Sequence, residues 1–140
     1  MKNELLGNTT LQPLLAPTAT ALSAGTSTAW ISRAAFKTAI ISVGVGEASG
    51  APTAQSLVAT VQHASDSSGT GAANLKDING DDITITLTED SVNASVDVDL
   101  SEADAYVGIS VVVALTAGTT PALPANAFIA LGDPEDTRNL

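Results

Sequence analysis

Residues 83–99 read ITITLTEDSVNASVDVD, and this stretch decides the fold class. In its first half isoleucine or leucine alternates with threonine, and in its second half valine or alanine alternates with a polar or acidic residue. Strict alternation places every second side chain on the same face of a strand. We therefore predict two strands with one face packed inward and the other in water, as in an antiparallel sheet.

The same period of two continues on both sides of this stretch. Glycine, proline and serine punctuate the chain between the alternating segments, most plainly in residues 65–71, SDSSGTG. The other predicted strands are residues 29–32, 36–43, 57–61, 106–115 and 127–132. Seven or eight short strands joined by turns predict an all-β protein, an antiparallel β-sandwich of jelly-roll-like type.

One predicted strand differs from the others. Residues 106–115 read YVGISVVVAL and leave few polar positions. A nearly continuous apolar run is typical of a central strand that is covered on both faces. The second cover is expected to come from another sheet or from a neighbouring subunit.

The first 27 residues lack this periodicity and are predicted to form an extended arm. Pro13 and Pro17 disfavour a helix there. The arm is too apolar for a simple linker because of six leucines, Leu5, Leu6, Leu11, Leu14, Leu15 and Leu22. Such an arm lies against a partner or folds back on its own domain, and its composition leaves both open. Residues 28–134 are then the sandwich domain and 135–140 a polar tail.

Composition limits the classes of function. The 140 residues fit one domain, and a hydrophobic content of 44% with only 3% aromatic residues predicts a modest core of small side chains. The absence of cysteine excludes disulfides and thiolate metal sites. The sequence contains no run of about 18 apolar residues, so no transmembrane helix is predicted. The N-terminal residues also lack the apolar segment of a secretory signal.

Charge argues against nucleic-acid binding. Fifteen acidic residues against five Lys and Arg give a formal net charge of −10. Nine of the acids lie from Asp77 to Asp104, and no Lys or Arg lies between those two residues. Binding to DNA or RNA depends mainly on neutralising phosphates, which requires the opposite sign.

The motifs that could carry chemistry are weak, and no catalytic, cofactor-binding or metal-binding residue is predicted. His63 is the only histidine, and a general base needs a partner nucleophile. Residues 77–82, DINGDD, resemble the start of a calcium loop, but Asp82 stands where the loop needs Gly and Thr88 where it needs Glu. The better interpretation is a type I′ hairpin turn at Asn79-Gly80. The protein is therefore expected not to be an enzyme.

Three segments carry a resemblance to a known family. QSLVATVQ at 55–62 runs into the loop ASDSSG at 64–69, YVGISVVV at 106–113 follows an acidic turn, and the last strand ends in ALGDP at 130–134. Over residues 36–134 this order resembles the small β-sandwich decoration (cement) or minor head proteins of tailed bacteriophages. The chain departs from the pattern just before residue 106, where relatives often carry basic or aromatic residues and this sequence reads Asp104-Ala105-Tyr106.

The resemblance implies a homotrimer that binds the major capsid protein on the outer surface of the virion and bridges neighbouring capsomers, after synthesis in the host cytoplasm. The first five leucines of the arm and Trp30 are then the expected contact residues, although Trp30 suits an ordinary core position equally well. Two alternatives stay open: a tail, baseplate or head-fibre component, and a carbohydrate-binding β-sandwich module, which would need exposed aromatic platforms.

Overall fold

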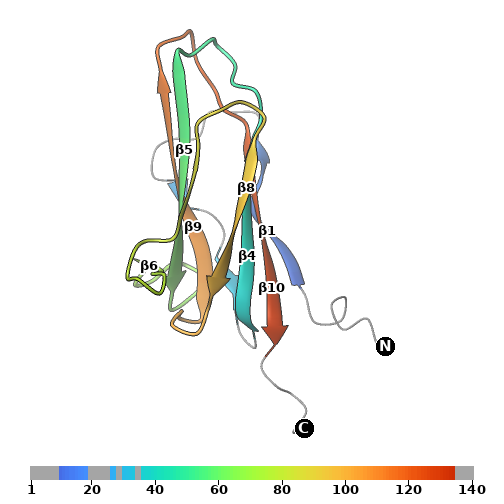
Figure 1. Cartoon of the computed structure of the whole chain (residues 1–140), viewed down its shortest axis with the longest axis vertical. Coiled ribbons are helices and arrows are strands. Elements are labelled where there is room, and N and C mark those ends of the chain that lie inside the picture. The colour runs from blue at the N-terminus through green and yellow to red at the C-terminus, as the bar shows by residue number, and fades with distance from the viewer. Residues whose placement is uncertain (1–9, 19–25, 28–29, 34–35, 135–140) are drawn as a thin grey trace, which may run out of the picture.

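The computed structural model describes residues 10–18, 26–27, 30–33 and 36–134, and over these ranges the chain is entirely β. Two antiparallel sheets pack face to face along the long axis of the molecule (Figure 1). The predicted all-β sandwich is therefore confirmed. Among the described residues there is no helix of the length and apolar character needed to span a membrane.

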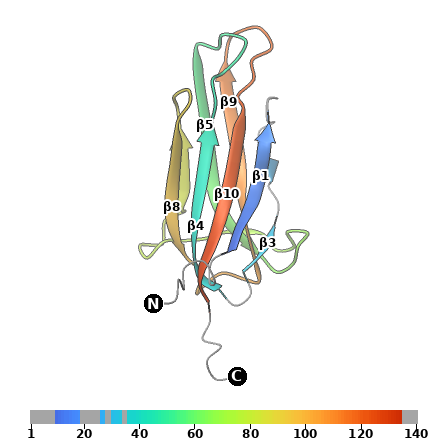
Figure 2. The same cartoon turned by 90° about the vertical axis from the view of Figure 1, so that its right-hand side faces the viewer.

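The first sheet contains four long strands. In spatial order they are β1 (Thr10–Thr18), β10 (Ala125–Pro134), β4 (Phe36–Val45) and β8 (Asn93–Asp99). Figure 2 shows this sheet from its outer side, with β1 and β8 at the two edges.

The second sheet is built around two strands of eleven residues, β5 (Ala54–Ala64) and β9 (Tyr106–Thr116), which pair along their whole length. The short strands β2 (Thr26–Ser27) and β3 (Ile31–Ser32) pair with the outer side of β9. On the other side, β6 (Ala73–Asn74) and β7 (Thr84–Leu87) both pair with β5.

The order of pairing is jelly-roll-like. The first strand pairs with the last, β2 and β3 pair with β9, β4 pairs with β8, and β5 pairs with β6 and β7. A chain that pairs from its ends inward is one long hairpin. Rolling that hairpin brings β10 beside β4 and β9 beside β5, which closes the two sheets over each other.

The core lies between the sheets and consists of the inward residues of each strand. Ile41 on β4 faces Ile129 on β10 across the ladder, and neither has any exposed surface. Leu57 on β5 and Val111 on β9 are equally buried in the opposite sheet. Every buried side-chain nitrogen or oxygen of the described residues has a hydrogen-bond partner, so burial leaves none of these polar groups unsatisfied.

The stretch that decides the fold class folds with the predicted faces but not as a neighbouring pair. Ile83, Ile85 and Leu87 point into the core, and Asp97 and Asp99 are exposed, as expected. However, β7 pairs with β5 in one sheet, whereas β8 pairs with β4 in the other. A period of two indicates which face is buried and says nothing of which strand lies alongside.

Strand β9 is central in its sheet, but it is covered on one face only. Its inward residues Val107, Ile109 and Val111 are buried, whereas Val112 on the outer face is 43% exposed and Ala114 is exposed as well. Within the described residues, the predicted cover from another sheet is present on the inner face of the strand alone.

Part of the predicted arm lies in the sandwich. Residues 10–18 form the edge strand β1 along β10, with Leu11 opposite Ala130 and Leu15 opposite Ala127. The arm is extended there, and this part of it folds back on its own domain. Thr26–Ser27, at the end of the predicted arm, form β2, whereas residues 1–9 and 19–25 lie outside the described residues, as does the polar tail at 135–140.

Candidate binding surfaces

No cluster of metal-binding side chains is found in the described residues. None of their His, Asp and Glu side chains form a group of three or more that could hold a metal ion. The calcium-like sequence at residues 77–82 therefore brings no such cluster together.

The single histidine serves as a cap at the end of β5. Its Nδ1 accepts a hydrogen bond from the backbone N–H of Asp104 at 3.1 Å and lies 3.3 Å from the carboxylate of the same residue. A ring nitrogen that accepts a hydrogen bond carries no proton to donate to the carboxylate, so the amide contact describes this geometry better than an ion pair does. Ser65, in the following loop, directs its hydroxyl to the Thr70 carbonyl at 3.0 Å.

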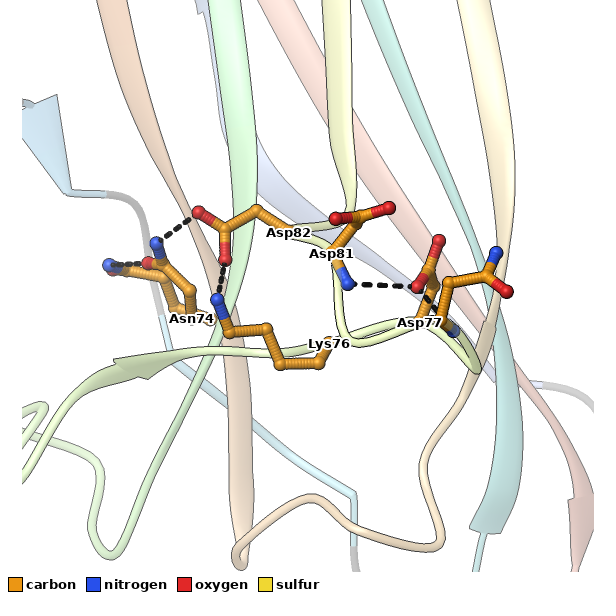
Figure 3. A network of polar contacts seen from close by, with 7 residues as sticks. Asn74, Lys76, Asp77, Asp81 and Asp82 are labelled. Carbon is orange, nitrogen blue, oxygen red and sulfur yellow. Dashed lines mark hydrogen bonds and ion pairs between the residues drawn. The ribbon is translucent and has the colours of Figure 1, made fainter.

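The acidic turn at residues 77–81 is held closed by one carboxylate (Figure 3). Oδ1 of Asp77 accepts the backbone N–H groups of Asn79 at 2.8 Å and Asp81 at 3.0 Å. The N–H of Gly80 donates to the Asp77 carbonyl at 3.0 Å, and Gly80 has a φ of +86°. Asn79 lacks the positive φ that a type I′ turn requires. The predicted hairpin turn is in place, but its type was wrong: it is a three-residue turn that ends in a left-handed glycine.

A second set of contacts braces the base of the same turn (Figure 3). The ammonium group of Lys76 pairs with the Asp82 carboxylate, which also accepts a hydrogen bond from the Asn74 amide at 2.9 Å. These contacts, that of Lys76 foremost, lower the pKa of Asp82 below its ordinary value. Because its base and tip are both tied, the turn presents Ile78 from a defined backbone, and this isoleucine is fully exposed.

The outer surface of the second sheet is formed by uncharged strands, with the Lys76–Asp82 ion pair at its margin beside β6. Across its six described strands the sequence contains no Asp, Glu, Lys or Arg. Val58 on β5 lies between Val112 on β9 and Thr86 on β7 in the ladder. We call this surface the charge-free face, and its outward residues are Ser56, Val58, Thr60, Thr84, Thr86, Ser110, Val112 and Ala114.

The outer surface of the first sheet is different in two respects. Its exposed isoleucine, Ile40 at 48%, stands directly opposite Asp97 of β8, so charge adjoins the apolar position. Farther along the sheet is an open groove of about 570 Å³. Gly44 forms its floor between Asn126 and Asn93, and a Cβ at Gly44 would stand 2.7 Å from Oδ1 of Asn126.

Similarity to known proteins is confined to distant structural likeness. No protein-family model matches the chain, and no curated protein is significantly similar to it. The crystal structure of the SPBc2 prophage-derived protein YomS shares 11% identity at a TM-score of 0.45, covering 90% of this chain and 94% of that one.

Two viral structures are more distant still. The structure of infectious bursal disease virus, Gx strain, shares 13% identity at a TM-score of 0.42 and covers 92% of this chain but 33% of that one. The Tobacco streak virus coat protein shares 12% identity at 0.36 and covers 91% and 86%. Likeness at these levels carries no functional inference.

The predicted contact residues occupy separate places. Leu11, Leu14 and Leu15 belong to β1, and Leu5 and Leu6 fall outside the described residues. Trp30 is half-buried just before β3, where its indole lies against Gly69 of the loop that follows β5. The assignment of Trp30 and the leucines of the arm to partner contact stays a prediction.

Sequence reasoning missed the exposed Ile78 and the charge-free face. The signal for the second was present, because the segments that became β5, β7 and β9 contain no charged residue. It was hidden because residues so far apart in sequence meet only when the sheet forms. Arg33 was also missed: its guanidinium donates to the backbone carbonyls of Ala103 at 2.7 Å and Asp104 at 3.0 Å and so fixes the turn before β9.

Proposed function

We propose that this chain is a structural protein of a tailed-phage virion that binds the major capsid protein on the outer surface of the capsid. It acts there as a decoration subunit: a homotrimer, made in the host cytoplasm, whose attachment bridges neighbouring capsomers. The sequence resemblance over residues 36–134 suggested this role. One structural observation supports it.

That observation is the distribution of exposed apolar side chains. Three large ones stand out among the described residues, and each lies on a different surface. Ile40 lies on the outer face of the first sheet, Val112 on the charge-free face and Ile78 at the tip of the acidic turn. An enzyme concentrates its special residues in one concave site. A bridging subunit needs several separate contact surfaces instead, because it must hold its own copies and its target together.

Bridging also explains how a small, modestly packed domain can stabilise a capsid. A trimer presents each capsid-binding surface three times, so the second and third contacts form at a high effective concentration. Each contact can then be weak while the attached trimer is retained. The acidic charge of the subunit suits a position outside the shell, away from packaged DNA.

The capsid contact is assigned to the N-terminal residues, with Leu5 and Leu6 as apolar anchors. Residues 10–18 are engaged with β10 over six register pairs, so we assign the capsid contact to residues 1–9, the part of the predicted arm that precedes this strand. A truncation that tests the arm must therefore stop before Thr10, since a longer one removes an edge strand of the sandwich.

The proposal is tested by sedimenting purified protein with empty capsids of the phage that encodes it. The full chain is expected to co-sediment at a saturating ratio and to raise the temperature at which the capsids break. A chain without residues 1–9 is expected to fold equally well and to bind at least tenfold more weakly, the loss of about 1.4 kcal/mol. Failure of the full chain to bind would refute the decoration role, and equal binding by the truncated chain would refute the assignment to the arm.

Copy number separates this role from that of a tail or baseplate component. A decoration subunit is expected at a molar amount close to that of the major capsid protein in purified virions, because its sites repeat over the whole shell. Quantitative mass spectrometry of virions measures the ratio. A ratio of a few copies per particle would favour the tail or baseplate alternative.

A second candidate, carbohydrate binding, is favoured by the groove over Gly44. Asn93 and Asn126 flank its floor, and Phe128 contributes the aromatic surface that sugars stack against. Gly44→Val would fill the groove. If this candidate is correct, a glycan array shows saturable binding by the natural chain that the variant lacks, and an array without saturable binding rejects it.

A further inference from the structure

We infer that the charge-free face is the surface through which copies of this chain pack against one another. The inference deepens the proposed function, which expects an oligomer but does not say which surface forms it. It rests on the distribution of charge, the chemistry of the outward residues and the size of the face.

The charge distribution selects this surface. With a net charge of −10, two copies repel each other wherever their acids approach. In the described strands, charged residues occur only in the first sheet, at Lys37, Asp97, Asp99 and Asp133. The other charged residues of the described ranges lie outside strands. Contact through the strands of the second sheet therefore buries no charged strand residue, and the carboxylate that adjoins them at β6, that of Asp82, is paired with Lys76.

The absence of charged residues from these strands also indicates that the partner bound to this face is a second copy of the chain. A partner of opposite charge is drawn to the acids of a −10 chain, and the charge-free face has none to offer it. A second copy presents an equally uncharged surface, so the contact removes no strand charge from water and avoids that desolvation penalty. Depletion of charged residues at the centre is also what distinguishes subunit interfaces from the rest of a protein surface.

The outward residues form an apolar centre with a polar border, as in subunit interfaces. Val58 and Val112 oppose each other directly on β5 and β9, and Ala114 follows opposite Ser56, which gives an apolar centre. Thr84 and Thr86 on β7 border this centre and are exposed. A hydroxyl group both donates and accepts a hydrogen bond, so such a border can pair with polar groups of a neighbouring copy.

The face offers about half the area of a standard interface. Eleven residues in β5 and in β9 give a length of about 36 Å, at about 3.3 Å per residue. These two strands at about 4.8 Å spacing give a width of about 10 Å, and the four residues of β7 add a strip of about 13 by 5 Å, so the projected area is about 400 Å². This is of the same order as the ~800 Å² per partner of a standard stable interface.

The outer face of the first sheet provides a matched control. Ile40 is as exposed as Val112, 48% against 43%, and like Val112 it lies within a long strand with its side chain turned outward. Its neighbour across the ladder is Asp97, so self-association there would bring carboxylates together. The two positions differ in the charge around them and hardly at all in exposure.

Sedimentation equilibrium of the full chain tests the inference. The natural protein is expected to form an oligomer at micromolar concentration, Val112→Glu to be at least tenfold weaker in association, and Ile40→Glu to associate as the natural chain does. Circular dichroism checks that both variants fold. A monomeric natural protein, or an unchanged oligomer in Val112→Glu, would overturn the inference.

A cross-linking experiment covers the case in which Val112→Glu does not fold. The chain has no cysteine, so Val112→Cys and Ile40→Cys each introduce a single thiol. A short bismaleimide is expected to join copies through position 112 and not through position 40. Equal cross-linking at both positions, or none at 112, contradicts the inference.

The capsid-binding assay keeps the two proposals apart. If the chain associates through position 112 but does not bind capsids, the interface stands and the decoration role fails. If it binds capsids as a monomer, the decoration role stands and the interface fails.

Discussion

The indole of Trp30 lies against the Cα of Gly69, so closely that a Cβ atom at position 69 would stand 2.6 Å from Nε1. Gly69 also has a φ of +82°, which L side chains rarely adopt. Two independent conditions therefore require glycine at this point, one from the backbone and one from the neighbouring ring. The contact ties the loop after β5 to the segment that leads into β3, and it accounts for the half-buried state of Trp30.

Gly69→Ala is expected to destabilise the fold by about 2–4 kcal/mol, because it adds steric overlap with the indole to the cost of a positive φ. Gly71→Ala is the matched control: Gly71 has a φ of +67° and nothing within 4 Å of an added Cβ. That variant should lose only about 1–2 kcal/mol, the backbone cost alone. Urea unfolding measures both free energies, and equal losses would show that the contact with Trp30 contributes nothing.

Adjacent residues on β4 test the assignment of faces in the sandwich. Ile41 is fully buried and Ile40 is 48% exposed. Ile41→Ala is expected to lower the free energy of unfolding by about 2–5 kcal/mol through lost burial and a cavity. Ile40→Ala should cost under about 1 kcal/mol, the range of strand propensity at an exposed site. Chemical denaturation would contradict the register if the exposed position were the more sensitive.

The burial of alternate residues in the strands shows what could be predicted from the sequence. Alternation predicted the strands and their buried faces correctly for residues 83–87 and 93–99, because burial of every second side chain is a local consequence of strand geometry. It did not show that β7 and β8 lie in different sheets, since pairing depends on contacts distant along the chain. The all-β class was therefore predictable, while the strand neighbours were not.

The candidate surfaces were less predictable than the fold. The uncharged segments were visible in the sequence, but only the ladder places Val58 beside Val112. The exposure of Ile78 was not visible either, because the Asp77 carboxylate places this residue in the turn by accepting two backbone N–H groups beyond it. Hydrogen bonds from a side chain to its neighbouring backbone groups can favour a turn even where alternating residues would favour a strand.

The role of β1 is tested by a second truncation. Removing residues 1–18 deletes β1 and exposes the backbone groups of β10 that it pairs with. At about 1 kcal/mol for each hydrogen bond lost, several kcal/mol of stability should disappear. Removing residues 1–9 should leave the unfolding midpoint within experimental error. Differential scanning calorimetry distinguishes the two, and an unchanged midpoint without β1 would show that this strand is dispensable.

Acid should weaken the contact between two loops at the end of the sandwich away from Ile78. Oδ1 of Asp90 accepts hydrogen bonds from the Ala48 backbone N–H at 2.9 Å and from Gln55 Nε2 at 2.6 Å. These bonds, the Ala48 one foremost, hold the pKa of Asp90 below its ordinary value of 3.8. A depressed carboxyl pKa contributes stability that is present above the ordinary value and is lost as the pH falls through the lowered one.

The difference in unfolding temperature between the natural chain and Asp90→Asn should therefore be largest above about pH 5 and shrink below pH 4. Glu89→Gln removes the same charge at the next residue and controls for the general relief of repulsion in an acidic protein. A difference that stays constant from pH 7 to pH 3 would show that the charge on Asp90 does not matter to these bonds.

The central claim, a decoration role on a capsid, is tested most directly by adding the full chain to empty capsids of its phage and imaging them by cryo-electron microscopy. The account predicts three-fold density on the outer surface where capsomers meet, into which the sandwich fits with its charge-free faces turned toward the three-fold axis. A bare outer surface at a concentration that saturates the protein's own association would contradict it.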